Sequence, residues 1–182
     1  MQNAIDHGGG AMPTDATHAG AGSLLLDLVN SRLEFDDHVD DELAADAEAA
    51  AWLVAHGGTG DGDEIADARA ARPLLARFLR GQAPIEELEP WTGAITRRPA
   101  FGPDGARWRE DLAPGRRIGA RAMLEWADLQ GPEGSRIRPC AASDCQHFFI
   151  DTSRANTRRW HSMETCGNRA KARRHSARAK LG

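Results

Sequence analysis

The chain has 182 residues, a formal net charge of −4 and three cysteines, a length that suits one domain of about a hundred residues with a small appendage. It contains no apolar run near the ~18–20 residues of a membrane helix, and its first residues lack the basic and apolar regions of a signal peptide. Three cysteines, two of them close in sequence, do not make a disulfide framework, and reduced thiols favour a cytoplasmic location.

The first part of the chain divides into a tail and the start of a folded body. Residues 1–22 are rich in Gly, Ala, Thr and His and have few large apolar residues, so we predict a flexible tail. The dense apolar segment Ser23–Arg32 is predicted to be buried. Its length leaves helix and strand open, and we favour a helix with Ser23 as N-cap.

Helical patterns dominate the next hundred residues. We predict a helix over Glu42–His56, capped by Asp40 or Asp41, and a second over Glu64–Arg80 that Pro73 should kink or split. A short helix should follow Pro84. The turn sequence at 102–105 predicts a small hairpin, Pro114–Gln130 predicts an amphipathic helix, and 131–134 reads as a linker. Residues 23–135 are therefore expected to form a mostly helical α+β domain.

Residues 136–182 carry a pattern typical of a structural zinc site. Cys140 and Cys145 form one closely spaced pair, and His161 and Cys166 form another after fifteen intervening residues. Zinc in structural sites takes four Cys or His ligands in a tetrahedron, often from two such pairs. His147 is the competing imidazole for the fourth position. A chance cluster of free cysteines is the alternative, which the pairing disfavours.

The residues between and after the pairs predict a finger of the treble-clef type. Phe148–Ile150 favours a strand, Arg158–Trp160 is expected to return as its partner, and the Ala/Arg/Lys-rich run after Cys166 favours a helix. Trp160 is expected to pack on the zinc core. Four protein ligands leave no open position for a catalytic water, so we expect no enzymatic activity from this site.

Charge is distributed unevenly along the chain. Residues 136–182 hold 11 Lys/Arg against 3 Asp/Glu, whereas residues 1–135 hold 12 against 24. A basic end on an acidic body is typical of a nucleic-acid-binding module. Pairing of the basic end with the acidic body is the alternative. The residues expected to contact nucleic acid are Arg158, Arg159, Arg169, Lys171, Arg173, Arg174, Arg178 and Lys180.

The C-terminal run resembles a known family. Its pattern is FxDxSR followed by RRWxxMxxCGNRxK, from Phe149 to Lys171, and this resembles the CGNR zinc finger. In that family the finger follows an ABATE domain, and the pair is described as a stress-induced transcription regulator. The opening Leu24–Arg32 is similar to that domain's first segment. The family usually has Cys where this chain has His161.

These observations predict a DNA-binding transcription regulator with a structural zinc ion and a basic helix that contacts duplex DNA. An RNA-binding or protein-interaction adaptor built on the same module is the alternative. One small finger reads about three base pairs, so a homodimer formed through residues 23–135 is expected. The resemblance further implies a small-molecule effector for that body.

Overall fold

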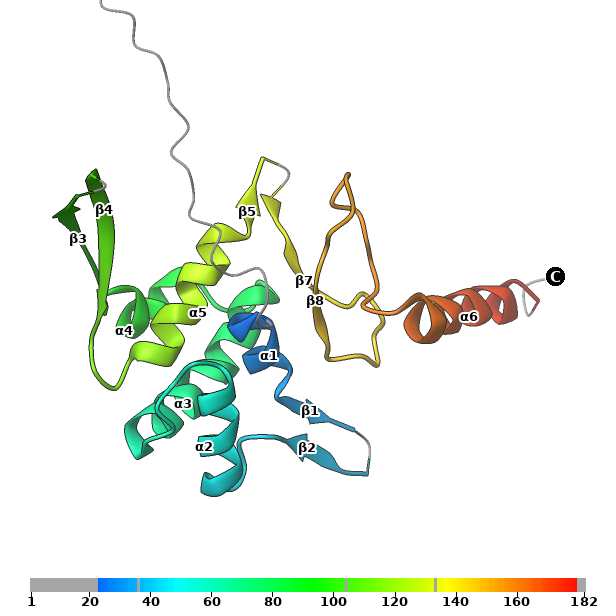
Figure 1. Cartoon of the computed structure of the whole chain (residues 1–182). Helices are drawn as coiled ribbons and strands as arrows, with labels where there is room; N and C mark the ends of the chain where they lie inside the picture. Colours follow the sequence, from blue (N-terminus) through cyan, green and yellow to red (C-terminus); the bar gives the residue numbers. More distant parts are fainter. Residues whose placement is uncertain (1–22, 36, 104, 133, 180–182) are drawn as a thin grey trace, which may run out of the picture.

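The computed structural model describes residues 23–179 apart from 36, 104 and 133 (Figure 1). Outside that description lie the side chains of 177–179, the predicted tail 1–22 and Lys180. Helices and small antiparallel hairpins alternate along the chain. The helical elements are α1 (Leu24–Asn30), α2 (Asp46–Ala55), α3 (Gly62–Leu79), the 3₁₀ turn η1 (Ile85–Leu88), α4 (Glu89–Thr92), α5 (Arg117–Asp128), the π-helical turn η2 (Met163–Gly167) and α6 (Asn168–Ala179). The strands are β1 (Arg32–Glu34), β2 (Val39–Asp41), β3 (Ile95–Gly102), β4 (Gly105–Leu112), β5 (Gln130–Gly131), β6 (Gly134–Ser135), β7 (Ile137–Pro139) and β8 (Phe148–Ile150).

The apolar core of the body lies where α1, α3 and α5 pack together, with α2 and α4 at its sides (Figure 1). The longer helices turn a stripe of apolar residues, mostly Leu, Ile and Ala, toward the centre, as amphipathic helices do, and α4 contributes Trp91. The fully buried large residues of this core are Leu24, Leu25, Leu28, Leu43, Leu53, Leu75, Leu88 and Ile118. The architecture is thus mixed α and β, with the helices forming the core and paired strands forming separate hairpins.

Two carboxylates fix the helices of the core to one another. Glu125 of α5 accepts hydrogen bonds from the Leu25 backbone N–H (2.8 Å) and the Ser23 hydroxyl (3.0 Å) at the start of α1. Asp67 of α3, which is fully buried, accepts from the Ile118 N–H at the start of α5 (2.8 Å) and from the Trp91 indole (2.6 Å). Each carboxylate satisfies N–H groups that a helix start leaves without intrahelical partners.

The helix predicted at the start of the body is confirmed. It begins at Leu24, and the Ser23 hydroxyl accepts from the Leu26 N–H, as an N-cap does. The next prediction was wrong in its start, because α2 begins at Asp46 and not at Glu42. Asp41 lies in β2, where its carboxylate binds the buried Arg72 guanidinium at 2.6 and 3.0 Å and so anchors the β1–β2 hairpin to α3.

The other helices and the hairpin predicted for the body are confirmed with adjusted bounds, but the split that was predicted as one effect of Pro73 is absent. Pro73 does not split α3, which runs unbroken from Gly62 to Leu79. The short helix after Pro84 is present as η1 and α4, and α5 corresponds to the predicted amphipathic helix. The predicted small hairpin is longer than expected, since β3 and β4 pair over eight residues each.

The segment predicted as a linker is a tight turn between paired strands. Gln130 pairs with Ser135, and the chain passes directly into β7. Ile137 of β7 and Phe148 of β8 belong to the core cluster of the body. The side-chain amide of Asn30 in α1 holds the Phe148 backbone from both sides, accepting from its N–H at 2.8 Å and donating to its C=O at 3.1 Å. The C-terminal module is thus docked on the body by packing and by hydrogen bonds.

No helix in the described part of the chain is both long and apolar enough to cross a membrane.

Candidate metal centre

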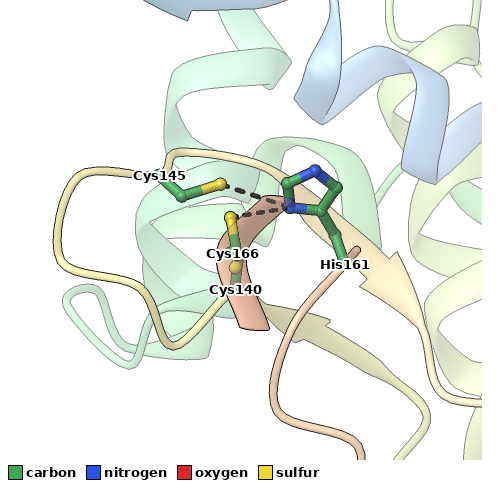
Figure 2. A group of neighbouring side chains, drawn as sticks. All are labelled: Cys140, Cys145, His161 and Cys166. Atoms are coloured by element: carbon green, nitrogen blue, oxygen red, sulfur yellow. Dashed lines mark hydrogen bonds between the residues drawn. The ribbon is translucent and has the colours of Figure 1, made fainter. Parts of the chain in front are cut away.

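The first pair of predicted ligands lies on the loop between β7 and β8. The Cys140 N–H donates to the His147 C=O at 2.8 Å, which closes the base of the loop. Within it, the Cys145 N–H donates to the Ala142 C=O at 3.1 Å, a tight turn that brings Cys145 back toward Cys140. The two sulfur atoms lie close together, in the group of side chains that Figure 2 draws.

The second pair lies on either side of the start of η2. Ser162 caps this turn by accepting from the Thr165 N–H at 3.2 Å. His161 precedes the cap, and Cys166 lies within the turn, fully buried. Because η2 continues directly into α6, the position of Cys166 also determines where the basic helix begins.

The ligand atoms of Cys140, Cys145, His161 and Cys166 all lie within 4.8 Å of one another. The His161 Nδ1 atom is 3.3 Å from the Cys145 sulfur and 3.7 Å from the Cys166 sulfur (Figure 2). Zn–S bonds of about 2.3 Å and Zn–N bonds of about 2.0–2.1 Å in a tetrahedron place sulfur and nitrogen roughly 3.6 Å apart. The four side chains therefore fit a structural zinc ion in spacing and in donor type.

His147 lies beside this group without joining it. Its ring stacks on that of His161, with ring centres 4.4 Å apart, and its Nδ1 atom is 3.6 Å from the Cys145 sulfur. The three cysteines cluster with His161 and not with His147. His147 therefore packs against the ring of the imidazole that belongs to the cluster. Trp160 packs on the same small cluster, as predicted.

The protonation of these groups suits a metal. Burial and the neighbouring thiols raise the pKa of Cys145 to about 12, so this thiol keeps its proton at neutral pH until a metal displaces it. Burial raises the pKa of Cys166 too, but the hydrogen bonds from Arg169, the neighbouring thiols and Thr165 together outweigh that effect, and the pKa is lowered overall. Burial lowers the pKa of His161, which keeps the imidazole neutral and able to bind metal.

Arg169 and Asp144 support the centre, and sequence reasoning did not find this role. The Arg169 guanidinium donates to the Cys166 sulfur at 3.1 Å and pairs with the Asp144 carboxylate at 3.0 Å. Arg173, one turn further along α6, binds the same carboxylate at 2.7 Å. Asp144 precedes Cys145 in the first loop, so this ion-pair network ties the loop to α6. Such a contact is not visible in sequence because its partners are 25 to 29 residues apart.

The predicted strand partner of β8 was wrong. Arg158–Trp160 forms no strand, and β8 pairs instead with β7, in the register Ile137↔Ile150 to Pro139↔Phe148. The reason is the buried Asp151, whose carboxylate accepts the backbone N–H groups of Ser153 (2.8 Å) and Arg158 (2.7 Å). The chain therefore folds around this carboxylate as a loop, and the treble-clef arrangement that we expected is not confirmed.

The structure separates the residues predicted to contact nucleic acid into several environments. Arg158 donates to the Trp160 C=O at 2.8 Å and lies over the Phe149 ring, so it holds the loop. Arg159 lies over the Trp160 ring. Lys171 and Arg174 are exposed on α6, and Arg174 bonds only within its own helix among the contacts described. Position 178 lies within α6, and Lys180 lies outside the described residues.

Comparison with known proteins bears on this part of the chain. No curated protein matches the sequence. The family model of the CGNR zinc finger matches residues 136–179, which include the four clustered ligands and all of α6. The last quarter of the chain is therefore similar to the CGNR zinc finger, and Cys140, Cys145, His161 and Cys166 are grouped there for a structural zinc ion.

Proposed function

We propose that the protein is a DNA-binding transcription regulator in which a structural zinc ion sets the position of the basic helix α6. The observation that supports this most directly is the surface of α6. The helix extends from the metal centre away from the body (Figure 1), and its side chains from Lys171 to Ser176 are all exposed. A helix that buries so little and carries so many cations is suited to a polyanion.

Zinc would have a structural role in this proposal. Its four protein ligands would complete the tetrahedron and leave no position for a reacting water. We therefore propose no catalytic activity for the site. The ion would join the Cys140–Cys145 loop to the start of α6, and the Asp144 network would hold the first turn of that helix in the same direction.

The cations of α6 would not all contribute equally to phosphate binding. Arg169 and Arg173 share one carboxylate, Asp144, so part of their charge is already neutralised. Lys171 and Arg174 lie on the neighbouring face, which position 178 also shares by helical spacing. We propose that this second face meets the DNA backbone. Three phosphate contacts would give a log–log salt slope of about −3, shallower than six cations would produce.

The regulator should be tested with the full chain, because Ile137 and Phe148 are part of the core of the body. Anisotropy of a labelled duplex would be measured with zinc-loaded protein across a salt series. We expect affinity to fall with salt, and the variant Lys171→Gln/Arg174→Gln to flatten the slope by about 2. The matched control is Arg173→Gln, whose charge is shared with Asp144 and which should change the slope less.

The alternative is an RNA-binding or protein-interaction adaptor. Equal or tighter binding of single-stranded RNA than of duplex DNA would favour it over the regulator. No binding of either nucleic acid at low salt would exclude the regulator and leave the protein-interaction role. A sensor function for the body and a role in stress response are proposals that come only from the resemblance to ABATE-containing regulators.

A further inference from the structure

The hairpin of β3 and β4 presents a surface that the zinc module does not use. Its strands pair from Ile95↔Leu112 to Gly102↔Gly105, and in Figure 1 it stands on the opposite side of the body from α6. Beyond the base, its side chains are mostly exposed. A two-stranded hairpin alone is marginally stable in water, so a ribbon of this length indicates a surface that is covered by something else.

The two faces of the ribbon differ in chemistry. Residues directly opposite each other on paired strands share a face, and successive residues alternate between faces. One face is charged and carries Arg98, Arg107, Arg109 and Asp111. The other carries what we call the ribbon patch, formed by Pro99, Phe101, Ala106 and Trp108.

The ribbon patch is strongly exposed for its composition. Phe101 is 82% exposed and Trp108 59% exposed. Antiparallel sheets with one apolar and one charged face commonly pack the apolar face on protein and leave the other in water. Pro99 lacks the backbone N–H that an added strand would use, which disfavours pairing along that edge. The patch is therefore suited to face-to-face packing with another protein surface.

The shape of the patch matches a copy of itself. Trp108 pairs with Pro99, and in the next row Phe101 pairs with Ala106, so the two large side chains lie on a diagonal and each adjoins a small one. Two copies can be related by a two-fold axis that lies in the plane of the face, either along the strands or across them between these two rows. Each of these axes places every large side chain over a small one of the other copy. The axis along the strands also sets Arg97 of each copy against Glu110 of the other.

We propose that the ribbon patch is the contact surface of a homodimer, with two β3–β4 hairpins packed face to face about a two-fold axis. Such an isologous contact requires a self-complementary surface, which the diagonal pattern and the Arg97–Glu110 pair (2.6 Å within one copy) provide. One ribbon face covers only a few hundred Å², below the roughly 800 Å² per partner of a standard interface, so the dimer should be weak, with a dissociation constant in the micromolar range.

A second copy fits the ribbon better than nucleic acid does. Three of the ribbon's four arginines lie on the face opposite the aromatic side chains, and two of these, Arg98 and Arg109, are paired with Asp111. The fourth, Arg97, shares the aromatic face but is paired with Glu110. A ribbon that inserted into DNA would present cations and aromatic residues together. The inference is independent of the proposed DNA binding, because it concerns a different surface and is tested without nucleic acid.

The test is sedimentation equilibrium of the zinc-loaded full chain from about 1 to 200 μM. We expect reversible dimerisation, and a dissociation constant at least tenfold higher for Trp108→Ser and for Phe101→Ser. The matched control is Arg107→Ser on the charged face, which should leave the constant unchanged. Far-UV circular dichroism and the thermal midpoint would show that each variant keeps the wild-type fold, as substitutions of exposed side chains should.

A further variant separates a shaped contact from general stickiness. Ala106→Trp enlarges the apolar area but fills the space that Phe101 or Trp108 of the other copy would occupy, depending on the axis, so it should weaken the dimer. Tighter association of Ala106→Trp would overturn the proposed packing. A wild-type chain that stays monomeric at 200 μM, or a dimer that the ribbon variants leave unchanged, would overturn the proposal. A monomer whose duplex affinity falls with Trp108→Ser would assign the ribbon to nucleic acid instead.

Discussion

Arg169 joins three features of the finger at one residue. Its guanidinium donates to the Cys166 sulfur and pairs with Asp144, while its backbone lies in the first turn of α6. Groups that hydrogen-bond to metal ligands orient them and tune their basicity. The Arg in the sequence Cys-Gly-Asn-Arg thus supports the metal centre, and its charge is not simply available to a partner.

Substitution of Arg169 is expected to weaken zinc binding. Arg169→Met should lower zinc affinity about 10- to 100-fold, because the Cys166 thiolate loses a charged donor. Competition with a chromophoric chelator would measure this. The control is Arg174→Met, which removes a cation from the same helix without touching a sulfur atom. Equal effects of the two substitutions would show that only the net charge of α6 matters.

The two histidines of the centre should behave differently. His161→Ala removes a ligand of the clustered set and is expected to abolish the tetrahedral Co²⁺ spectrum of the substituted protein, whereas His147→Ala should preserve it. His161→Cys should also preserve a tetrahedral site, with stronger sulfur-to-metal charge transfer. Loss of the spectrum in His147→Ala with retention in His161→Ala would reverse the assignment of the fourth ligand.

Zinc affinity should rise with pH. Burial and the neighbouring thiols raise the pKa of Cys145 to about 12 in the metal-free chain, so zinc must displace a proton there. Raising the pH removes that proton more easily and favours the complex, and lowering it favours the free thiol. We expect about one or more protons released per zinc at pH 7, measured by calorimetry in buffers of different ionisation enthalpy. Binding without proton release would exclude Cys145 as a thiolate ligand.

At the scale of elements, close packing of α4 on α5 requires a glycine. A Cβ atom on Gly119 would lie 2.1 Å from the Trp91 ring, and the Trp91 indole is itself held by Asp67. The start of α5, the ring of α4 and the carboxylate of α3 thus form one packed unit. A glycine in a helix costs backbone entropy, and here the close helix contact accounts for its presence.

Gly119→Ala is therefore expected to destabilise the protein by about 1–3 kcal/mol, because the Trp91 ring must move out of a packed position. Urea unfolding followed by circular dichroism would measure the change. Gly62→Ala in α3 is the control, since a Cβ atom there meets nothing within 4 Å. It should be neutral or slightly stabilising. A similar loss in both variants would mean that the added methyl group destabilises the helices for a reason other than the Trp91 contact.

At the scale of the whole molecule, the finger is held at two places that should respond differently to zinc. The β7–β8 hairpin is attached to the body through Ile137, Phe148 and the amide of Asn30. The segment from His161 through α6 is held through Cys166 and the Asp144 network. The first attachment is apolar packing and backbone hydrogen bonding, and the second depends on the metal.

Chelation of zinc should therefore release α6 while β8 stays docked. We expect amide hydrogen exchange to become fast over 160–179 and to remain slow at Phe148, whose N–H is bound by Asn30. Mass spectrometry of peptides from the exchanged protein would resolve the two regions. Asn30→Ala provides the reciprocal control, because it should loosen β8 in the zinc-loaded protein. Simultaneous loss of protection in both regions would indicate one cooperative unit.

The sequence by itself determined the features that depend on neighbours along the chain. Ser23 predicted the start of α1, the turn residues at 102–105 predicted the β3–β4 hairpin, and the two closely spaced pairs predicted the four residues that the structure brings together. Caps, turns and ligand pairs depend on residues only a few positions apart, so a short stretch of sequence is enough to predict them.

Only the tertiary structure decided the contacts between distant residues. The partner of β8 is β7 because buried Asp151 takes the N–H groups of the loop that follows. Asp41 belongs to a strand because Arg72, 31 residues away, holds its carboxylate. Asn30 joins α1 to β8 across 118 residues. A buried polar group needs hydrogen-bond partners, and the fold can supply them from any part of the chain. Local sequence spacing therefore does not predict which residues these partners are.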